Sequence, residues 1–356
     1  MNIIIAGDFC PFDGFSFGVS EKVRCLFADA DYSFVNLECP LTNSDKQIYK
    51  VGPNLKASPK QIETLNALGV NCVTLANNHI QDYGGRGVVD TMKLCDNHGI
   101  RTVGAGCNIK EARIPLIIEK DGIRIAIINV AEREFNIATD NGAGANPFDI
   151  INLLNDIEQA RKVVNKIVVV IHGGLEYVPF PSPDSVRMLR FIAKQQNVIA
   201  VVRHHPHVIQ SMEVYDGVPI YYSLGNLYFP TVEEKNGGWF NGLIVKLEIK
   251  RDSVEFSHMT VAICRKKKYD FELIEKVMDL PHYCLDEIAG MWEREIVNRR
   301  MFYFDNLFFP WELLSRISRR LRLLNGAPPT KLKKAIAMNL IRCDAHREMI
   351  LEALKA

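Results

Sequence analysis

The chain has 356 residues, 47% of them hydrophobic, and its 43 lysines and arginines nearly balance 42 aspartates and glutamates. This length and apolar content are enough for a substantial buried core, and we expect one large domain with an appendage. The net charge of +1 provides no overall field to attract nucleic acid, so nucleic acid is not an expected partner.

The cysteine content and the hydropathy of the chain indicate the cellular compartment. The nine cysteines form no CxxC pairs, which argues against zinc knuckles and a disulfide framework. The apolar start, residues 2–6, is too short for a signal-peptide core and runs directly into Gly7-Asp8. No segment reaches the roughly 20 apolar residues that span a bilayer. We therefore expect a protein of the reducing cytoplasm.

Strands and helices alternate along the first two-thirds of the chain. The pattern predicts strands over 2–6 and 33–37 around a helix at 19–30, which is a βαβ beginning. The later predicted elements are a helix at 59–68, a strand at 72–75, a helix at 85–98, a hairpin at 116–130, a helix at 149–164, a strand at 167–171, a helix at 184–196 and a strand at 198–202. Two hairpins follow, turning at Asp216-Gly217 and near Arg251-Asp252. This order predicts a mixed two-sheet sandwich with helices outside.

The chain changes character after about Cys264. A run of basic residues, 265–268, opens a predicted α-helical appendage, so we divide the chain into domains 1–264 and 265–356. Within the appendage, residues 308–324 combine aromatic side chains with a basic amphipathic helical pattern. We favour packing of this helix on its own domain, and peripheral contact with an anionic membrane is the alternative.

Polar clusters follow the predicted strands. They are Gly7-Asp8, Asn36-Leu37-Glu38, Asn77-Asn78-His79, His172-Gly173-Gly174, His204-His205-Pro206-His207 and Ser223-Leu224-Gly225-Asn226. Ligands of open sheets collect beyond the carboxyl ends of the strands, so we expect these clusters to share one rim. Carboxylates, amides and imidazoles bind divalent Mn, Fe, Zn and Mg, and their combination is typical of two-metal hydrolases.

Each cluster also has a structural interpretation. Asp8 could cap a helix, Glu38 could belong to a turn, and His172 could be a satisfied core residue. Asn78-His79 could be a turn before a helix, but we prefer a catalytic role because the pair directly follows an apolar strand. In an extended segment the His205 and His207 side chains would point to the same side.

These motifs, in this order, resemble the CapA family, which is associated with bacterial capsule and poly-γ-glutamate synthesis. That family is in turn similar to calcineurin-like metallophosphoesterases. The resemblance covers about residues 2–262 and includes the sequences flanking Glu38, Asn78 and His172. It implies an α/β fold, a four-layer αββα sandwich, with one or two divalent metal ions at the strand ends.

The resemblance also implies roles for individual residues. Asp8 and His207 would hold one ion, Asn78, His172 and His205 the other, and Glu38 would lie between them. His79 would protonate the leaving group, oriented by Asp82. The candidate residues for substrate binding or for support of the ligands are Glu176, Tyr177 and Asn226.

Four positions depart from the pattern of the family or its wider superfamily. Cys10 stands where the superfamily usually has a histidine two residues after Asp8, and Glu38 replaces the usual bridging aspartate. Gly173 stands where tryptophan is frequent, and Arg203 stands where glycine precedes the histidine pair. Arg203 either binds an anionic substrate or faces solvent.

Three functions follow from this pattern. The first is a metal-dependent hydrolase linked to capsule or exopolymer synthesis, acting on a phosphoester or an anionic polymer. The second is a non-catalytic accessory subunit of a membrane-bound capsule synthase, and the third is a scaffold at the inner face of the membrane. The Asn78-His79 pair favours the enzyme, because a structural metal site has no use for a proton donor, whereas Cys10 favours the other two.

Overall fold

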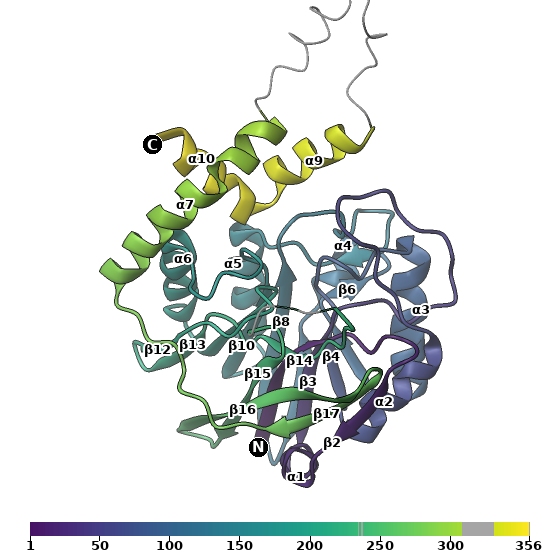
Figure 1. Cartoon of the computed structure of the whole chain (residues 1–356). Coiled ribbons are helices and arrows are strands. Elements are labelled where there is room, and N and C mark those ends of the chain that lie inside the picture. Colours follow the sequence, from purple (N-terminus) through teal and green to yellow (C-terminus); the bar gives the residue numbers. More distant parts are fainter. Residues whose placement is uncertain (234, 236–237, 308–330, 356) are drawn as a thin grey trace, which may run out of the picture.

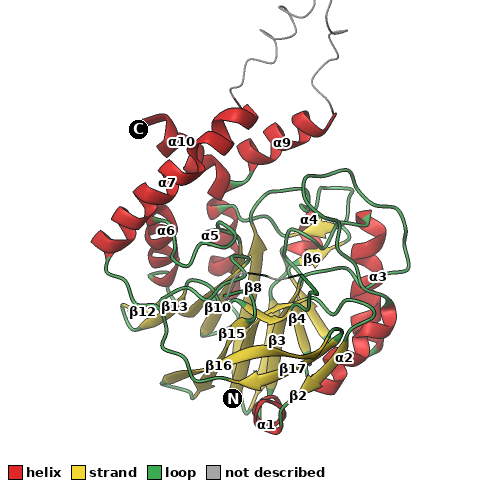
Figure 2. Cartoon of the chain, in the orientation of Figure 1, coloured by secondary structure: helices red, strands yellow, loops and turns green. Residues whose placement is uncertain are grey.

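The computed structural model describes residues 1–233, 235, 238–307 and 331–355. Two β-sheets lie face to face, with helices on both outer faces and three further helices above the strand ends (Figures 1 and 2). The layers follow from the sequence pattern, because strands buried on both faces alternate with amphipathic helices.

The larger sheet has nine strands in the order β2-β17-β16-β15-β1-β3-β4-β5, with β14 also paired to β1. Its parallel half consists of β1, β3, β4 and β5, and its antiparallel half contains the predicted hairpin of β15 and β16. The strands are β1 Asn2–Phe9, β2 Ser16–Val19, β3 Tyr32–Leu37, β4 Cys72–Thr74, β5 Arg101–Val103, β14 Asn226–Tyr228, β15 Asn241–Ile249, β16 Val254–Lys267 and β17 Asp270–Glu275.

The smaller sheet has six strands in the order β12-β13-β11-β10-β8-β7. Both of its predicted hairpins are present, β7 with β8 and β12 with β13. The strands are β7 Leu116–Lys120, β8 Ile123–Ala131, β10 Lys166–His172, β11 Val198–His204, β12 Met212–Tyr215 and β13 Val218–Tyr221; a separate ribbon pairs β6 Ala105–Gly106 with β9 Gly144–Ala145.

Three hydrophobic layers separate the four structural layers. The central layer interleaves β1 and β15 with β8, β10 and β11, for example through Ile5, Val245 and Val170. A second layer lies between the larger sheet and helices α1 to α3, and a third lies between the smaller sheet and helices α5 and α6. The four-layer αββα sandwich is therefore confirmed.

Apart from the short helix α4, which was not predicted, the helices of the sandwich agree with the predicted ones within a few residues. They are α1 Glu21–Ala28, the 3₁₀ turn η1 Pro59–Gln61, α2 Ile62–Leu68, α3 Gly84–Asn97, α4 Ile109–Ala112, α5 Ile150–Ala160 and α6 Pro183–Ala193. Ser182 caps α6, where its hydroxyl accepts the Ser185 N–H, and Pro183 occupies the first turn.

The helical appendage begins later than predicted. Strand β16 runs through residue 264, and β17 adds to the same sheet by pairing with β16 and β2, so the sandwich extends to Glu275. Pairing between segments about 250 residues apart has no local signal, which is why residue 265 was the wrong place to begin the appendage. The described helices of the appendage are α7 Leu285–Leu307, α9 Lys331–Arg342 and α10 Asp344–Lys355.

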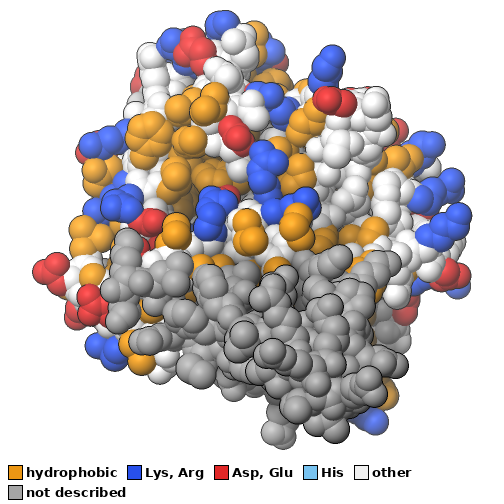
Figure 3. Space-filling model, turned by 90° about the horizontal axis from the view of Figure 1, so that it is seen from above, with side chains coloured by type: hydrophobic (Ala, Val, Ile, Leu, Met, Phe, Trp, Pro, Cys, Tyr) orange, Lys and Arg blue, Asp and Glu red, His pale blue; other side chains and the backbone are white. Residues whose placement is uncertain are grey.

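The appendage lies above the sandwich at the end opposite the N-terminus (Figure 1). Seen from above, its described face shows hydrophobic side chains together with Lys and Arg side chains (Figure 3). The predicted membrane-contact segment 308–324 lies outside the described residues. Among the described helices, none is long and apolar enough to cross a bilayer.

Candidate metal centre

The polar clusters predicted to share one rim do meet there. In the larger sheet, Asp8 at the end of β1 lies opposite Asn36 of β3 and Asn226 of β14. In the smaller sheet, His172 at the end of β10 lies opposite His204 of β11. Because these parallel strands all end at the same edge, side chains from five separate parts of the chain face one another.

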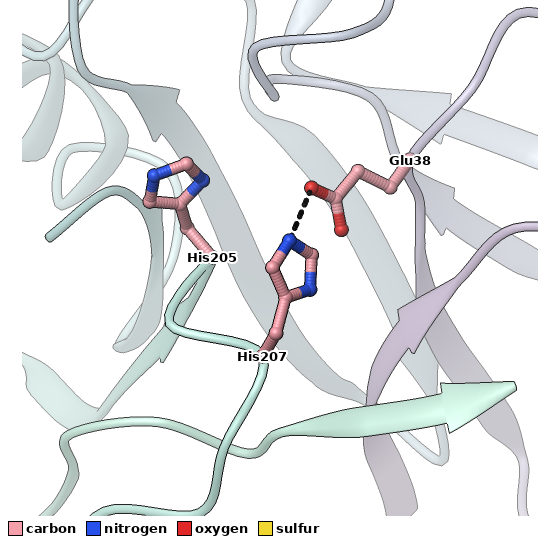
Figure 4. A group of neighbouring side chains, drawn as sticks. All are labelled: Glu38, His205 and His207. Atoms are coloured by element: carbon pink, nitrogen blue, oxygen red, sulfur yellow. Dashed lines mark ion pairs between the residues drawn. The ribbon is translucent and has the colours of Figure 1, made fainter. Parts of the chain in front are cut away.

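Two groups of three side chains have the geometry of a metal site. One is Glu38, His205 and His207, and the other is Asp8, Glu38 and His172, with ligand atoms within 4.8 Å of one another in each group. Glu38 belongs to both groups, and Figure 4 shows its carboxylate facing the His207 ring with His205 beside them. Glu38 Oε1 lies 3.5 Å from His172 Nε2 and 3.6 Å from His207 Nε2.

The Glu38 carboxylate is the clearest indication of a cation site. The side chain is fully buried, and neither carboxylate oxygen has a hydrogen-bond partner. Burial and the neighbouring Asp8 raise the pKa of Glu38 well above its ordinary value. A buried carboxylate without a partner is costly, and a divalent ion shared with the imidazoles removes that cost. The donor set, two carboxylates and several imidazoles, therefore fits one or two divalent ions with Glu38 between them.

The other acidic ligand is held in its ionised form. Burial alone would raise the pKa of Asp8, but the neighbouring side chains of His204 and His207 bring that pKa below its ordinary value. His204 Nδ1 lies 3.1 Å from Asp8 Oδ1. Sequence reasoning did not include His204 among the ligands, although it lies directly beside His205.

Two imidazoles of the site, those of His205 and His172, are held neutral, as metal ligands must be. Burial lowers the pKa of His205 to about 4. Burial and the neighbouring His205 lower the pKa of His172 well below its ordinary value. A cation that enters this site does not have to displace protons from these two rings at neutral pH.

The histidine loop after β11 is not extended, contrary to the prediction. His205 and His207 have φ angles of 96° and 58°, in the left-handed region that non-glycine residues seldom occupy. The rings converge because the backbone turns back at both residues, and not because alternate residues of a strand share a face. Such strain is sustained by the surrounding structure and is concentrated at functional sites.

Amide side chains orient the imidazoles. Asn78 Oδ1 lies 2.9 Å from His172 Nε2, and Asn36 Nδ2 lies 3.1 Å from His172 Nδ1 and donates to Asp8 Oδ1 at 2.7 Å. His207 Nδ1 lies 3.0 Å from Asn226 Oδ1, which leaves Nε2 directed at Glu38. Asn226 is fully buried behind His207, a position that suits support of this ligand better than contact with substrate.

His79 lies beside the ligands in a hydrogen-bonded group of its own. Its Nδ1 is 2.7 Å from Asp82 Oδ2 and 3.0 Å from Lys50 Nζ, and Lys50 also pairs with Asp82 at 2.5 Å. Burial and the positive charge of Lys50 lower the pKa of His79, while Asp82 opposes that shift. Sequence reasoning missed Lys50, because it lies in the irregular segment 43–56, which has no periodic pattern.

A cleft of about 730 Å³ opens over the ligands and His79. Glu176 and Tyr177, the candidates for substrate binding or for support of the ligands, line it, and so does Glu134, which sequence reasoning missed. Burial and the nearby Glu176 raise the pKa of Glu134 to about 8. Glu134 Oε1 is 3.9 Å from His205 Nε2, so this acid lies at the edge of the metal centre.

The Arg203 side chain does not face solvent. Arg203 is also not among the described residues that line this cleft. Its side chain is buried, and its guanidinium donates to Glu132 Oε1 at 3.0 Å and to Ser185 Oγ at 2.7 Å. The solvent-facing interpretation is therefore wrong, and binding of substrate in the cleft is not supported. Arg203 instead neutralises a second buried carboxylate behind the histidine strands.

The fold and site together define a sandwich with a buried carboxylate and imidazole centre at its strand ends. The model of the family described as bacterial capsule synthesis protein PGA_cap matches residues 14–231, more than half of the chain. The chain belongs to this family.

Curated relatives agree with this assignment. The chain is 31% identical over 221 residues to the PGA biosynthesis protein CapA of Bacillus subtilis, an alignment that covers 59% of this chain and 56% of the relative. It is 35% identical over 221 residues to the capsule biosynthesis protein CapA of Bacillus anthracis, covering 59% and 53%. Thus the chain spans little more than half the length of the curated relatives it matches.

More distant similarities were also found. A probable polyglutamine synthesis accessory protein of Mycobacterium tuberculosis is 25% identical over 211 residues, covering 55% of each chain. The crystal structure of a calcineurin-like phosphoesterase of Bacillus subtilis aligns with 74% of this chain and 90% of its own at a TM-score of 0.45 and 14% identity.

Proposed function

We propose that this chain is a divalent-metal-dependent hydrolase that cleaves a phosphoester or an anionic polymer in the synthesis of a bacterial capsule or exopolymer. The observation that carries the proposal is the Glu38 carboxylate, buried without a hydrogen-bond partner between imidazoles that burial keeps neutral. A site with only a structural task would be expected to satisfy this group within the fold.

The ion-holding residues would be Asp8, Glu38, Asn78, His172, His205 and His207. When bound, a divalent ion supplies Lewis-acid activation of the substrate and neutralises charge that develops during cleavage. Glu38 would share one ion with His205 and His207 and another with Asp8 and His172, since the ligand atoms of each group lie within 4.8 Å of one another. This division differs from the one implied by the resemblance. His204 would support Asp8.

His79 is the proposed proton donor. Asp82 and Lys50 surround its Nδ1, so Nε2 is the nitrogen left to face the cleft. Asp82 holds the ring in one orientation, and Lys50 fixes Asp82 in turn. An oriented imidazole beside a metal centre is suited to proton transfer. His79 would donate through Nε2 when the ring is protonated, the form that Asp82 favours and that burial and Lys50 disfavour.

A non-catalytic accessory role is the second candidate. It is supported by Cys10, which offers a buried thiol where the wider superfamily usually has a histidine, and by the printed name of the mycobacterial relative, an accessory protein. In that case the protein would act beside a membrane-bound capsule synthase in the cytoplasm, and the metal would stabilise the fold.

The deciding experiment measures metal content and turnover in wild type, His205→Ala, His79→Ala and the matched control His98→Ala. Metal per chain is measured by plasma mass spectrometry, and turnover is measured with a generic phosphodiester and with a γ-glutamyl peptide. We expect His205→Ala to lose metal, whereas His79→Ala keeps metal and loses turnover by about 10²–10⁴-fold. His98 is exposed at the end of α3 and should affect neither quantity.

Equal and undetectable turnover in fully loaded wild type and His79→Ala would instead establish the accessory role for these substrates. A chain that binds no divalent ion at all would contradict both candidates.

A further inference from the structure

The C-terminal helices form part of the wall of the cleft. Arg299 of α7, Asn339 of α9 and His346 of α10 line it together with His79 and His205. These three residues lie beyond residues 14–231, the part of the chain that the family model matches. The cleft over the metal centre is therefore completed by residues from outside the family region.

This wall is held by a hydrophobic core of its own. Leu175, Val178 and Phe180 of the loop after β10 pack against buried residues of the helices, which include Trp292, Ile296, Leu340 and Met349. The same loop carries Glu176 and Tyr177 into the cleft. The position of these two residues therefore depends on the helices.

A buried ion pair joins the helices to the histidine strands. Glu132 Oε1 accepts from Arg203, while Glu132 Oε2 accepts the Ala345 N–H at 3.1 Å and the Cys343 thiol at 3.3 Å. The backbone N–H of Glu132 donates to His172 O at 2.9 Å. The start of α10 is thus fixed to the frame of the metal centre.

The wall presents hydrogen-bonding groups that the fold leaves available. The Asn339 side chain is only 8% exposed, and its Oδ1 has no hydrogen-bond partner. Arg299 donates through Nη2 to Glu176 O at 3.2 Å and through Nε to Glu295, and its side chain stays partly exposed in the cleft. A buried acceptor without a partner is costly, and a donor on a ligand would remove that cost.

We propose that Asn339 and Arg299 form a specificity subsite for an acidic unit of the substrate, one that carries an anionic group close to an N–H or O–H donor. Asn339 Oδ1 would accept the donor, and the Arg299 guanidinium would face the anionic group. Both a glutamyl unit and an acidic sugar have this chemistry, whereas a simple phosphodiester does not. This inference rests on the proposed function and defines its substrate class.

The test measures binding without turnover. Full-length His79→Ala protein loaded with Mn²⁺ is titrated by calorimetry with an oligo-γ-glutamate and with an oligogalacturonate of equal length, so that the stronger of the two identifies the source of the acidic unit. Asn339→Leu and Arg299→Gln, each added to this background, are expected to weaken that binding about tenfold or more. The exposed Asn298→Leu and Arg294→Gln on α7 are the matched controls and should leave it unchanged.

The proposal is overturned if neither oligomer binds, or if Asn339→Leu and Arg299→Gln bind as the parent does. Arg299→Gln guards against a folding defect at the buried Asn339, because Arg299 is partly exposed, and melting temperatures check both variants. A failure here leaves metal content and phosphodiester turnover unaffected, so it is distinguishable from a failure of the proposed function.

Discussion

Glu38 and Glu132 are two buried carboxylates that each directly follow a strand, and their surroundings differ completely. Glu38 follows β3 of the larger sheet, and Glu132 follows β8 of the smaller sheet. Glu132 is paired with Arg203 and accepts two further hydrogen bonds from the start of α10. Glu38 accepts none and faces imidazoles.

This difference separates an acid that the fold satisfies from one that it does not. Arg203 and the Ala345 N–H supply within the fold what Glu132 requires, so its charge is neutralised without a ligand. The fold leaves Glu38 to be neutralised by a proton or by a cation. The comparison predicts opposite responses when the two carboxylates or their neighbours are changed.

Replacement of Arg203 is expected to have the largest effect on stability. Arg203→Met leaves Glu132 buried without its cation, and loss of one partner of a buried pair costs about 3–5 kcal/mol of unfolding free energy. Urea denaturation measures the loss. The control is Arg86→Met, which removes an exposed pair with Asp90 and should cost less than about 1 kcal/mol. Equal costs in the two variants would contradict a structural role for Glu132.

A divalent ion bound at the site that contains Glu38 should stabilise the folded protein. At a hundredfold excess of Mn²⁺ over its dissociation constant, the unfolding free energy of the wild type is expected to rise by about 2.7 kcal/mol. Thermal unfolding with and without a chelator measures this gain. His205→Ala should lose the gain and His98→Ala should keep it; a gain of equal size in His205→Ala would place the cation elsewhere.

Gly173→Ala tests whether the Glu132 side chain needs the space that glycine, which has no Cβ, leaves at position 173. A Cβ at Gly173 would lie 2.5 Å from Glu132 Cδ, and such overpacking costs about 1–3 kcal/mol. Gly290→Ala on α7 is the matched control, because the nearest atom is the end of Arg294 at 3.8 Å; it should stabilise the protein by about 0.5–1 kcal/mol. Chemical denaturation of both variants measures the two changes in unfolding free energy, which should have opposite signs.

The pH dependence of the metal-free protein should report Glu38. Its folded-state pKa is raised, so above about pH 4.5 the folded protein keeps a proton that the unfolded chain loses, and stability falls as pH rises. Glu38→Gln is expected to remove up to about 1.4 kcal/mol per pH unit from this decline, over the pH range in which the folded protein still holds the proton.

Glu134→Gln is the control variant for that measurement. The pKa of Glu134 is raised to about 8, so the loss of stability that Glu134 causes should stop near that pH. A decline that is identical in wild type and Glu38→Gln would show that Glu38 ionises freely in the folded protein.

Much of the fold and of the site followed from local patterns. The apolar run 167–171 and the N-terminal strand could be recognised by composition, and each ends at a side chain of the centre, His172 or Asp8. The rule that parallel strands end at one edge then brought the motifs together. Lys50 was missed because it lies in an irregular segment, whose sequence has no periodic pattern.

The sequence by itself determined the alternation of strands and helices and the chemical identity of the ligands at the strand ends, because both are written in residues close together in the chain. Tertiary structure alone decided which carboxylate is satisfied, how the left-handed His205 and His207 turn inward, and that Asn339 and Arg299 reach the cleft. Those outcomes depend on partners a hundred or more residues apart, and contacts at that range follow from packing of the whole molecule.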